Sequence, residues 1–116
     1  MLGEIIGLGL VGLAALGGRQ TFYDYYTADR VNLIRQRASN RAHAEQDILL
    51  FLHNYSRNVG RPRTGDVTGI LGNYAYGILL KMQDRDLIRF DKDGYIRPGK
   101  QLASRGSFVT MYTGGQ

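Results

Sequence analysis

The sequence predicts a mainly α-helical protein with one small β-hairpin. No glycine or proline interrupts residues 19–59, a stretch that is too long for an ordinary loop and therefore favours helix. From Ala44 onward apolar residues recur at helical spacing, and an Asp-Gly pair near residue 93 separates two short apolar runs, which is typical of a hairpin. With 116 residues, the chain has room for one small domain and an additional arm.

Residues 1–18 are the most apolar part of the chain, with six glycines and one charged residue, Glu4. We expect them to form a glycine-rich anchor helix. A helix over residues 5–18 spans roughly 20 Å, which is less than the roughly 30 Å of bilayer hydrocarbon, so only a thin or assisted crossing fits. Small residues fall near one face of this helix, where they allow another backbone to approach closely: Gly3, Gly7, Ala14 and Gly17.

Three interpretations of this arm remain open. It embeds in a membrane or a membrane assembly, it is buried in a soluble oligomer, or it is a cleaved signal, although Glu4 stands where a secretory signal carries a basic residue. If the arm crosses a membrane, the arginines that follow it place the C-terminal domain on the cytoplasmic side. The absence of cysteine fits an intracellular or virion-interior setting and excludes disulfides and thiolate metal sites.

Residues 19–43 are expected to form an arginine-rich connector helix. A loose apolar face through Phe22, Tyr26, Val31 and Ile34 fades into a wholly polar stretch at residues 35–41. This polar stretch is either an exposed spacer helix or a break, and we expect the domain boundary there. The net charge of +5 is concentrated in this half of the chain, since residues 19–63 carry eight arginines against four acids.

Residues 44–100 are expected to form the folded domain. An apolar stripe from Ile48 to Tyr55 predicts a core helix that ends before residue 60. A short helix capped by Thr64 follows, and a turn at Gly72-Asn73 leads into a third helix that continues to about residue 86. The side chains of this third helix that we expect to face inward are Tyr76, Leu79, Leu80 and Met82.

The end of the domain is predicted to be a two-stranded hairpin. Residues 87–90 and 95–97 are the expected strands, and the segment Asp91-Lys92-Asp93-Gly94 supplies the turn, because Asp-Gly tolerates positive φ. Residues 101–116 alternate only weakly between apolar and polar and are expected to form an extended tail.

The order of helix, short helix, glycine turn, helix and hairpin resembles a winged helix-turn-helix domain over about residues 44–97. The segments that carry the resemblance are residues 48–52 for the first helix, 67–72 for the second, and 87–96 for the wing. In DNA-binding members of this family, the third helix enters the major groove and the wing contacts the adjoining backbone. Other winged helices dock proteins, for which an exposed patch of Tyr74 and Ile78 would be suited.

The resemblance implies a set of residues that contact nucleic acid. Asn73 would meet an adenine edge and Lys81 a phosphate or guanine, and Tyr74, Gly77 and Ile78 would share their exposed face. Asn73 is equally explained as a helix cap, and Tyr74 as a packing aromatic. The side chains expected to neutralise phosphates are Arg61, Arg63, Lys92 and Arg97.

Enzymatic, metal or cofactor chemistry is not expected. His43 and His53 are not accompanied by an acid and a nucleophile in a recognisable arrangement. The hairpin turn lacks the later ligand positions of a calcium loop, and the scattered glycines do not form a phosphate-binding loop.

The predicted function is therefore a non-enzymatic nucleic-acid-binding protein whose winged-helix domain is tethered to a membrane or assembly by an apolar helix. Its expected partners are DNA or a protein for the domain, and a membrane or an apolar helix for residues 1–18. The alternative is a structural subunit of a virion or of a multi-protein membrane complex, whose winged-helix domain binds protein. In either case we expect an oligomer or assembly component, membrane-associated with a cytoplasmic domain or inside a virion.

Overall fold

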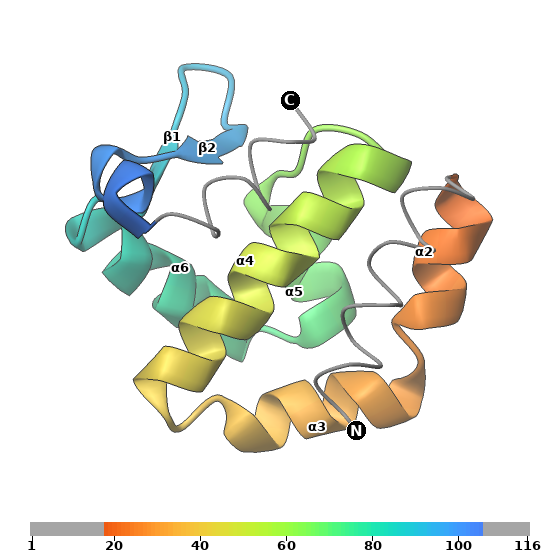
Figure 1. Cartoon of the computed structure of the whole chain (residues 1–116). Helices are drawn as coiled ribbons and strands as arrows, with labels where there is room; N and C mark the ends of the chain where they lie inside the picture. The colour runs from red at the N-terminus through yellow and green to blue at the C-terminus, as the bar shows by residue number, and fades with distance from the viewer. Residues whose placement is uncertain (1–17, 106–116) are drawn as a thin grey trace.

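The computed structural model describes residues 18–105. This part of the chain is mainly helical and carries one antiparallel two-stranded hairpin, which confirms the expected fold class at that level (Figure 1). The elements are α2 (Arg19–Tyr25), α3 (Ala28–Arg37), α4 (Arg41–Asn58), α5 (Thr64–Leu71), α6 (Tyr74–Asp84), β1 (Ile88–Phe90), β2 (Ile96–Pro98) and the 3-10 helix η1 (Lys100–Arg105).

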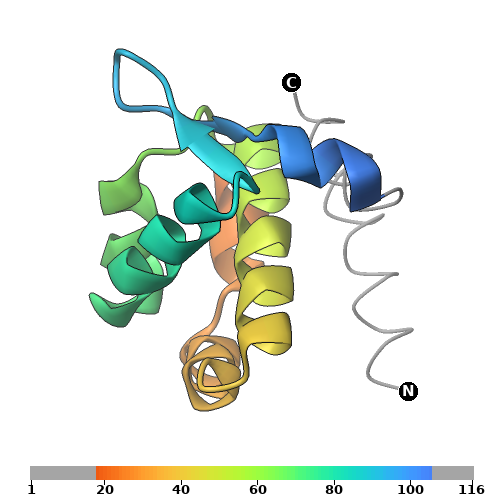
Figure 2. The same ribbon diagram turned by 90° about the vertical axis from the view of Figure 1, so that its left-hand side faces the viewer.

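Helix α4 runs through the middle of the fold, with helices α2 and α3 packed on one side of it and α6 on another (Figures 1 and 2). Its N-cap is Asn40, whose side-chain oxygen accepts a hydrogen bond from the backbone N–H of His43 at 3.1 Å. The predicted apolar stripe is confirmed as the main contribution of α4 to the core: Ile48, Leu49, Phe51, Leu52 and Tyr55 are buried.

Residues 19–43 belong to the same packed unit and do not form a single connector helix. Helix α2 ends at Tyr25, and Thr27 caps α3, since its hydroxyl accepts a hydrogen bond from the backbone N–H of Arg30 at 3.3 Å. Phe22 of α2 is fully buried, with its ring centroid 5.4 Å from that of Phe51. The polar stretch 35–41, expected at the domain boundary, consists of the end of α3, a turn at residues 38–40 and the first residue of α4. Residues on both sides of this turn contribute to one core.

The exposed and buried faces of α6 differ from the expected ones. Tyr76 and Leu80 were expected to face inward, but their side chains are 50% and 37% exposed. Tyr74 and Ile78, expected on the exposed face, pack partly buried against the core. The residues of α6 that are buried in the core are Ala75, Leu79 and Met82. Because successive residues of a helix are rotated by about 100°, burial of this face leaves Tyr76 and Leu80 on the solvent side.

A second local correction concerns the start of α5. Thr64 is the first helical residue and not the cap, because Arg63 occupies the N-cap position. The Asp66 carboxylate accepts a hydrogen bond from the backbone N–H of Arg63 at 2.8 Å and holds this turn. The extended residues just before the helix are thereby positioned beside the hairpin.

The predicted hairpin is confirmed, with β1 and β2 paired antiparallel. The Asp91 side chain accepts hydrogen bonds from the N–H groups of Asp93 and Tyr95, both at 2.9 Å, and Gly94 adopts the positive φ of +86° that glycine tolerates best. Residues 61–63 add a third extended segment on the other side of β2. There the N–H of Ile96 donates to the carbonyl of Pro62 at 2.9 Å, and Arg63 forms an antiparallel bridge with Tyr95.

The C-terminal tail begins later than expected, because residues 100–105 form η1 and Leu102 is fully buried. Gly99 permits this turn, since a Cβ at this position would lie 2.2 Å from the carbonyl oxygen of Asp86. The rest of the tail lies outside the described residues, as does the anchor helix with Gly3, Gly7, Ala14 and Gly17. Within residues 18–105, no helix has the length and apolar composition needed to cross a bilayer.

Removing the Phe22 ring tests whether α2 is part of the cooperative core. We expect Phe22→Ala to lower the free energy of unfolding by about 3–5 kcal/mol, because the ring leaves a cavity among other buried aromatic side chains. Tyr23→Ala is the matched control on the same helix: Tyr23 is 45% exposed and loses one edge contact, for which we expect less than about 1.5 kcal/mol. Urea unfolding followed by circular dichroism measures both, and equal losses would contradict the assignment.

Candidate functional site

Basic side chains gather on the outward face of the hairpin and of the extended segment beside it. Side chains alternate between the two faces of a strand, and the core takes Ile88 and Ile96. Their neighbours Arg89 and Arg97 therefore project outward, where the strand register places them directly opposite each other. We call the following residues the arginine face: Arg61, Arg63, Arg89, Lys92, Tyr95 and Arg97.

Tyr95 lies at the centre of this face. The guanidinium carbons of Arg63 and Arg61 lie 4.2 Å and 5.6 Å from the centroid of its ring, which is within the range of cation–π contact. The bridge between Arg63 and Tyr95 fixes the backbone under this stack. The three arginines 61, 63 and 97 expected to contact phosphate are thus brought together by two segments that are far apart in the sequence.

The electrostatics of the arginine face are unbalanced. Like charges directly opposite on antiparallel strands destabilise the pairing, and Arg89 and Arg97 are such a pair. Asp91 lies 3.4 Å from the Nε atom of Arg97 and offsets part of this repulsion. Burial alone would raise the pKa of Asp91, but the N–H groups of Tyr95 and Asp93 and the Arg97 guanidinium hold it below its usual value, so this carboxylate is ionised at neutral pH. A bound anion would relieve the remaining repulsion.

Helix α6 presents a different kind of surface. Asn73 occupies its N-cap position without making a side-chain cap hydrogen bond, so the amide is not used for capping. The exposed side chains of this face include one cation, Lys81, and one anion, Asp84, which leaves the face without net charge. Tyr74 is not part of it, and its hydroxyl is buried.

The residues expected to contact nucleic acid therefore fall into two groups. Arg61 and Arg63 lie over the Tyr95 ring, Arg97 lies on β2 and Lys92 is exposed at the hairpin turn. In contrast, Asn73 is the N-cap of α6 and Lys81 lies on that helix. Sequence reasoning missed Arg89 and Tyr95. The signal for Arg89 was present in the alternation of β1 and in the hairpin register, whereas the role of Tyr95 depends on its contact with a distant segment.

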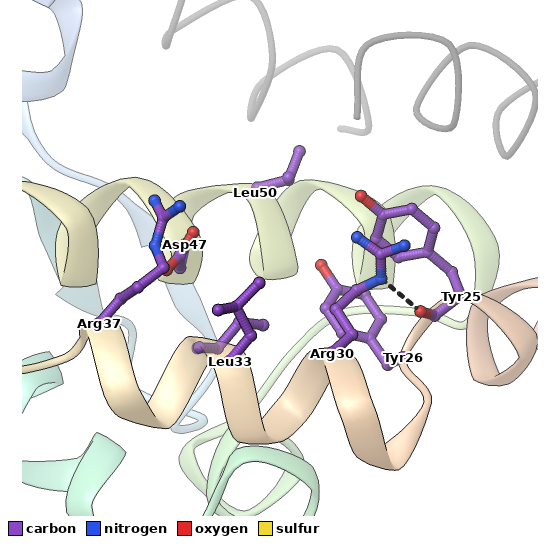
Figure 3. Close-up of a pocket in the computed structure, with 8 residues that line it drawn as sticks. Tyr25, Tyr26, Arg30, Leu33, Arg37, Asp47 and Leu50 are labelled. Atoms are coloured by element: carbon purple, nitrogen blue, oxygen red, sulfur yellow. Dashed lines mark hydrogen bonds and ion pairs between the residues drawn. The ribbon is translucent and has the colours of Figure 1, made fainter. Parts of the chain in front are cut away.

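A hollow between α3 and α4 is lined by apolar and charged side chains (Figure 3). Its arginines are engaged within the protein: the Nε atom of Arg30 donates to the carbonyl of Tyr25 at 2.8 Å, and Arg37 lies 3.1 Å from Asp47. With a volume of about 30 Å³, it has room for little more than water. We therefore do not regard it as a ligand site.

A second hollow, of about 130 Å³, lies between the start of α4 and α6. Its lining includes Arg41, Lys81 and the buried Glu45. The carboxylate of Glu45 forms an ion pair with Arg85. Both hollows are smaller than the roughly 300–1,000 Å³ of ordinary small-molecule sites. The arginine face is a more extensive candidate for binding than either of them.

The two histidines have different environments. His43 is exposed at the start of α4, whereas His53 is buried in that helix. Among residues 18–105, no group forms a hydrogen bond with the Nδ1 atom of His53. Burial lowers the pKa of His53, and the nearby positive charge of Arg57 lowers it further. In the part of the chain that the structure describes, no group of three His, Cys, Asp or Glu side chains is placed to hold a metal ion.

Comparisons with known proteins do not assign this chain to a family. A scan against protein-family models and searches of curated proteins and of solved structures each found no match. No relative therefore supplies a function or a site residue. The contacts and charges of the described residues carry the assignment of function.

The lowered pKa of His53 predicts a loss of stability in mild acid. The unfolded chain binds a proton at this histidine near its ordinary pKa of about 6.5, whereas the folded protein resists it, so protonation favours unfolding as the pH falls below about 6.5. We expect the melting temperature to fall between about pH 7 and pH 5, and His53→Gln to weaken this dependence. His43→Gln, at an exposed position, should keep the wild-type profile. Identical profiles for wild type and His53→Gln in thermal melts would contradict the prediction.

Proposed function

We propose that residues 44–97 form a winged-helix domain that binds nucleic acid without enzymatic activity. The order of α4, α5, α6 and the β1–β2 hairpin supports this proposal, and residues 61–63 supply an extended segment beside β2 as a short third strand. Helices α2 and α3 pack onto this domain and extend its core.

The observation that carries the proposal is the pairing of Arg89 with Arg97, with Arg63 on the next segment of the same face. Neighbouring strands lie about 4.8 Å apart, so these guanidinium groups are spaced closely enough to contact successive backbone phosphates. Guanidinium binds phosphate through two parallel hydrogen bonds, and the bound anion offsets the repulsion between the arginines. The unfavourable charge pairing of the free hairpin thus becomes favourable in a complex.

We place the affinity on the arginine face and not on α6. Lys81 is balanced by Asp84 on the exposed side of that helix, and Tyr74 is partly buried. Phosphate contacts dominate affinity for nucleic acid and carry no sequence information. We accordingly expect binding to be strongly dependent on salt and weakly dependent on sequence.

For the apolar residues 1–18, the proposed role is that of a tether to a membrane or to a protein assembly. In a membrane, the arginines that follow this segment favour a cytoplasmic position for the domain, and in a virion the domain would lie inside. The alternative function is that of a structural subunit that binds protein. The observation that favours it is the exposure of Tyr76 and Leu80 on α6.

A salt titration of duplex DNA binding tests the role of the arginine face. Replacing Arg89 by alanine should weaken binding to all sequences alike and reduce the slope of log affinity against log salt by about 0.9, the value for one lost phosphate contact. Arg41→Ala is the matched control, because Arg41 is an exposed arginine at the start of α4, far from the hairpin (Figure 1). Fluorescence anisotropy at several salt concentrations gives both slopes.

The absence of salt-sensitive binding by the intact protein would contradict nucleic-acid binding. An equal slope for Arg89→Ala and wild type would contradict the placement of that binding on the arginine face. Circular dichroism of each variant establishes that the fold is retained. Binding to protein partners through α6 would then be the better-supported function.

A further inference from the structure

The exposed face of α6 forms one continuous stripe along the whole helix. Its members recur at spacings of three and four residues, which places them on one side of the helix, opposite the buried Ala75, Leu79 and Met82. The stripe consists of Asn73, Tyr76, Gly77, Leu80, Lys81 and Asp84. Within the described part of the chain, Tyr76 and Leu80 belong to the few large apolar side chains that are exposed.

Among the described residues, none makes a contact that requires glycine at position 77. Gly77 lies within α6. A Cβ atom added at this position would have no atom of another described residue within 4 Å, apart from the neighbouring backbone of the helix itself. Glycine inside a helix costs about 1 kcal/mol relative to alanine, so this position is destabilising without a compensating contact. The absent side chain leaves open space on the stripe next to Leu80.

The stripe is complementary to itself when it is read in the opposite direction. The amide of Asn73 then faces the carboxylate of Asp84, and the ring of Tyr76 faces the ammonium group of Lys81. Leu80 faces the open space at Gly77. Each of these pairs is centred on the same point of the helix, between residues 78 and 79, as an antiparallel pair of identical helices requires.

We propose that α6 is a homodimer contact, in which the helix pairs antiparallel with α6 of a second copy across a two-fold axis between residues 78 and 79. Leu80 of each copy then fills the space beside Gly77 of the other, and Tyr76 stacks on Lys81 of the other. The second copy is the occupant that this pattern favours, because every residue of the stripe finds its complement on the same stripe. A nucleic acid would leave Asp84 facing phosphate, which is unfavourable.

The size of the contact sets its expected strength. Helix α6 has 11 residues and is therefore about 16 Å long, so the paired helices bury less than the roughly 800 Å² per partner of a standard interface. Self-association through α6 is thus concentration-dependent. The arginine face lies on other elements and stays accessible in the pair.

Cysteine trapping on the full-length protein tests the geometry, because the natural chain has no cysteine. Chains carrying Gly77→Cys and Leu80→Cys are mixed in equal amounts and oxidised. We expect the mixed 77–80 disulfide to exceed both same-site disulfides, because positions 77 and 80 face each other, whereas same-site positions are offset along the helices by about 4.5 Å. A statistical mixture of the three products would overturn the proposed pairing.

Sedimentation velocity of full-length protein, in one detergent throughout, tests the energetics. Leu80→Arg should raise the dissociation constant of the pair by about tenfold or more, because it places a charge opposite Gly77 at the centre of the contact. Leu33→Arg is the matched control, since Leu33 is 41% exposed on α3 and Leu80 is 37% exposed. Association of Leu80→Arg that equals that of Leu33→Arg, or monomers of wild type at every concentration, would refute the proposal. DNA binding by Leu80→Arg reports separately on the arginine face.

Discussion

The contact of α2 with the middle of α4 is the interaction on which the rest of the fold depends. Four aromatic rings meet there at centroid separations between 4.9 and 6.0 Å, mostly edge to face: Phe22, Tyr26, Phe51 and Tyr55. The same contact supplies a partner for a buried polar group, because the Tyr26 hydroxyl accepts a hydrogen bond from Asn54 at 3.1 Å. Helix α2, which precedes the α4–α5–α6 unit in the chain, is therefore part of its core.

The arginine face and the exposed face of α6 are both determined by which side chains are buried in the core. Burial of Ile88 and Ile96 leaves the alternate positions of the hairpin outside, and these positions hold arginines. On α6, burial of Ala75 and Leu79 turns Tyr76 and Leu80 outward. The core thus determines a positively charged surface on the hairpin and a partly apolar surface without net charge on the helix, and this difference in charge separates the two proposed roles.

The sequence was sufficient to predict the elements whose patterns are local. The stripe from Ile48 to Tyr55 and the Asp-Gly turn both gave correct elements, because each pattern reflects one face or one turn. The buried face of α6 was predicted wrongly in part. Ala75 is too small to be recognised as a core residue, whereas Tyr76 and Leu80 are large and apolar and were therefore expected in the core. The arginine face was predicted only in part, because the contact of Arg63 with Tyr95 joins segments whose pairing leaves no local signal.

If the proposed binding of nucleic acid holds, the opposed arginines of β1 and β2 would give ionic strength two opposite effects on this protein. Dissolved salt screens the repulsion between Arg89 and Arg97 and so favours the ordered hairpin of the free protein. The same ions compete with phosphate and weaken a complex with nucleic acid. If the proposed binding of nucleic acid holds, order of the hairpin and occupancy of its outer face are thermodynamically linked, and a polyanion would stabilise this element as a ligand. The free hairpin would then gain most from such a ligand where the salt concentration is lowest.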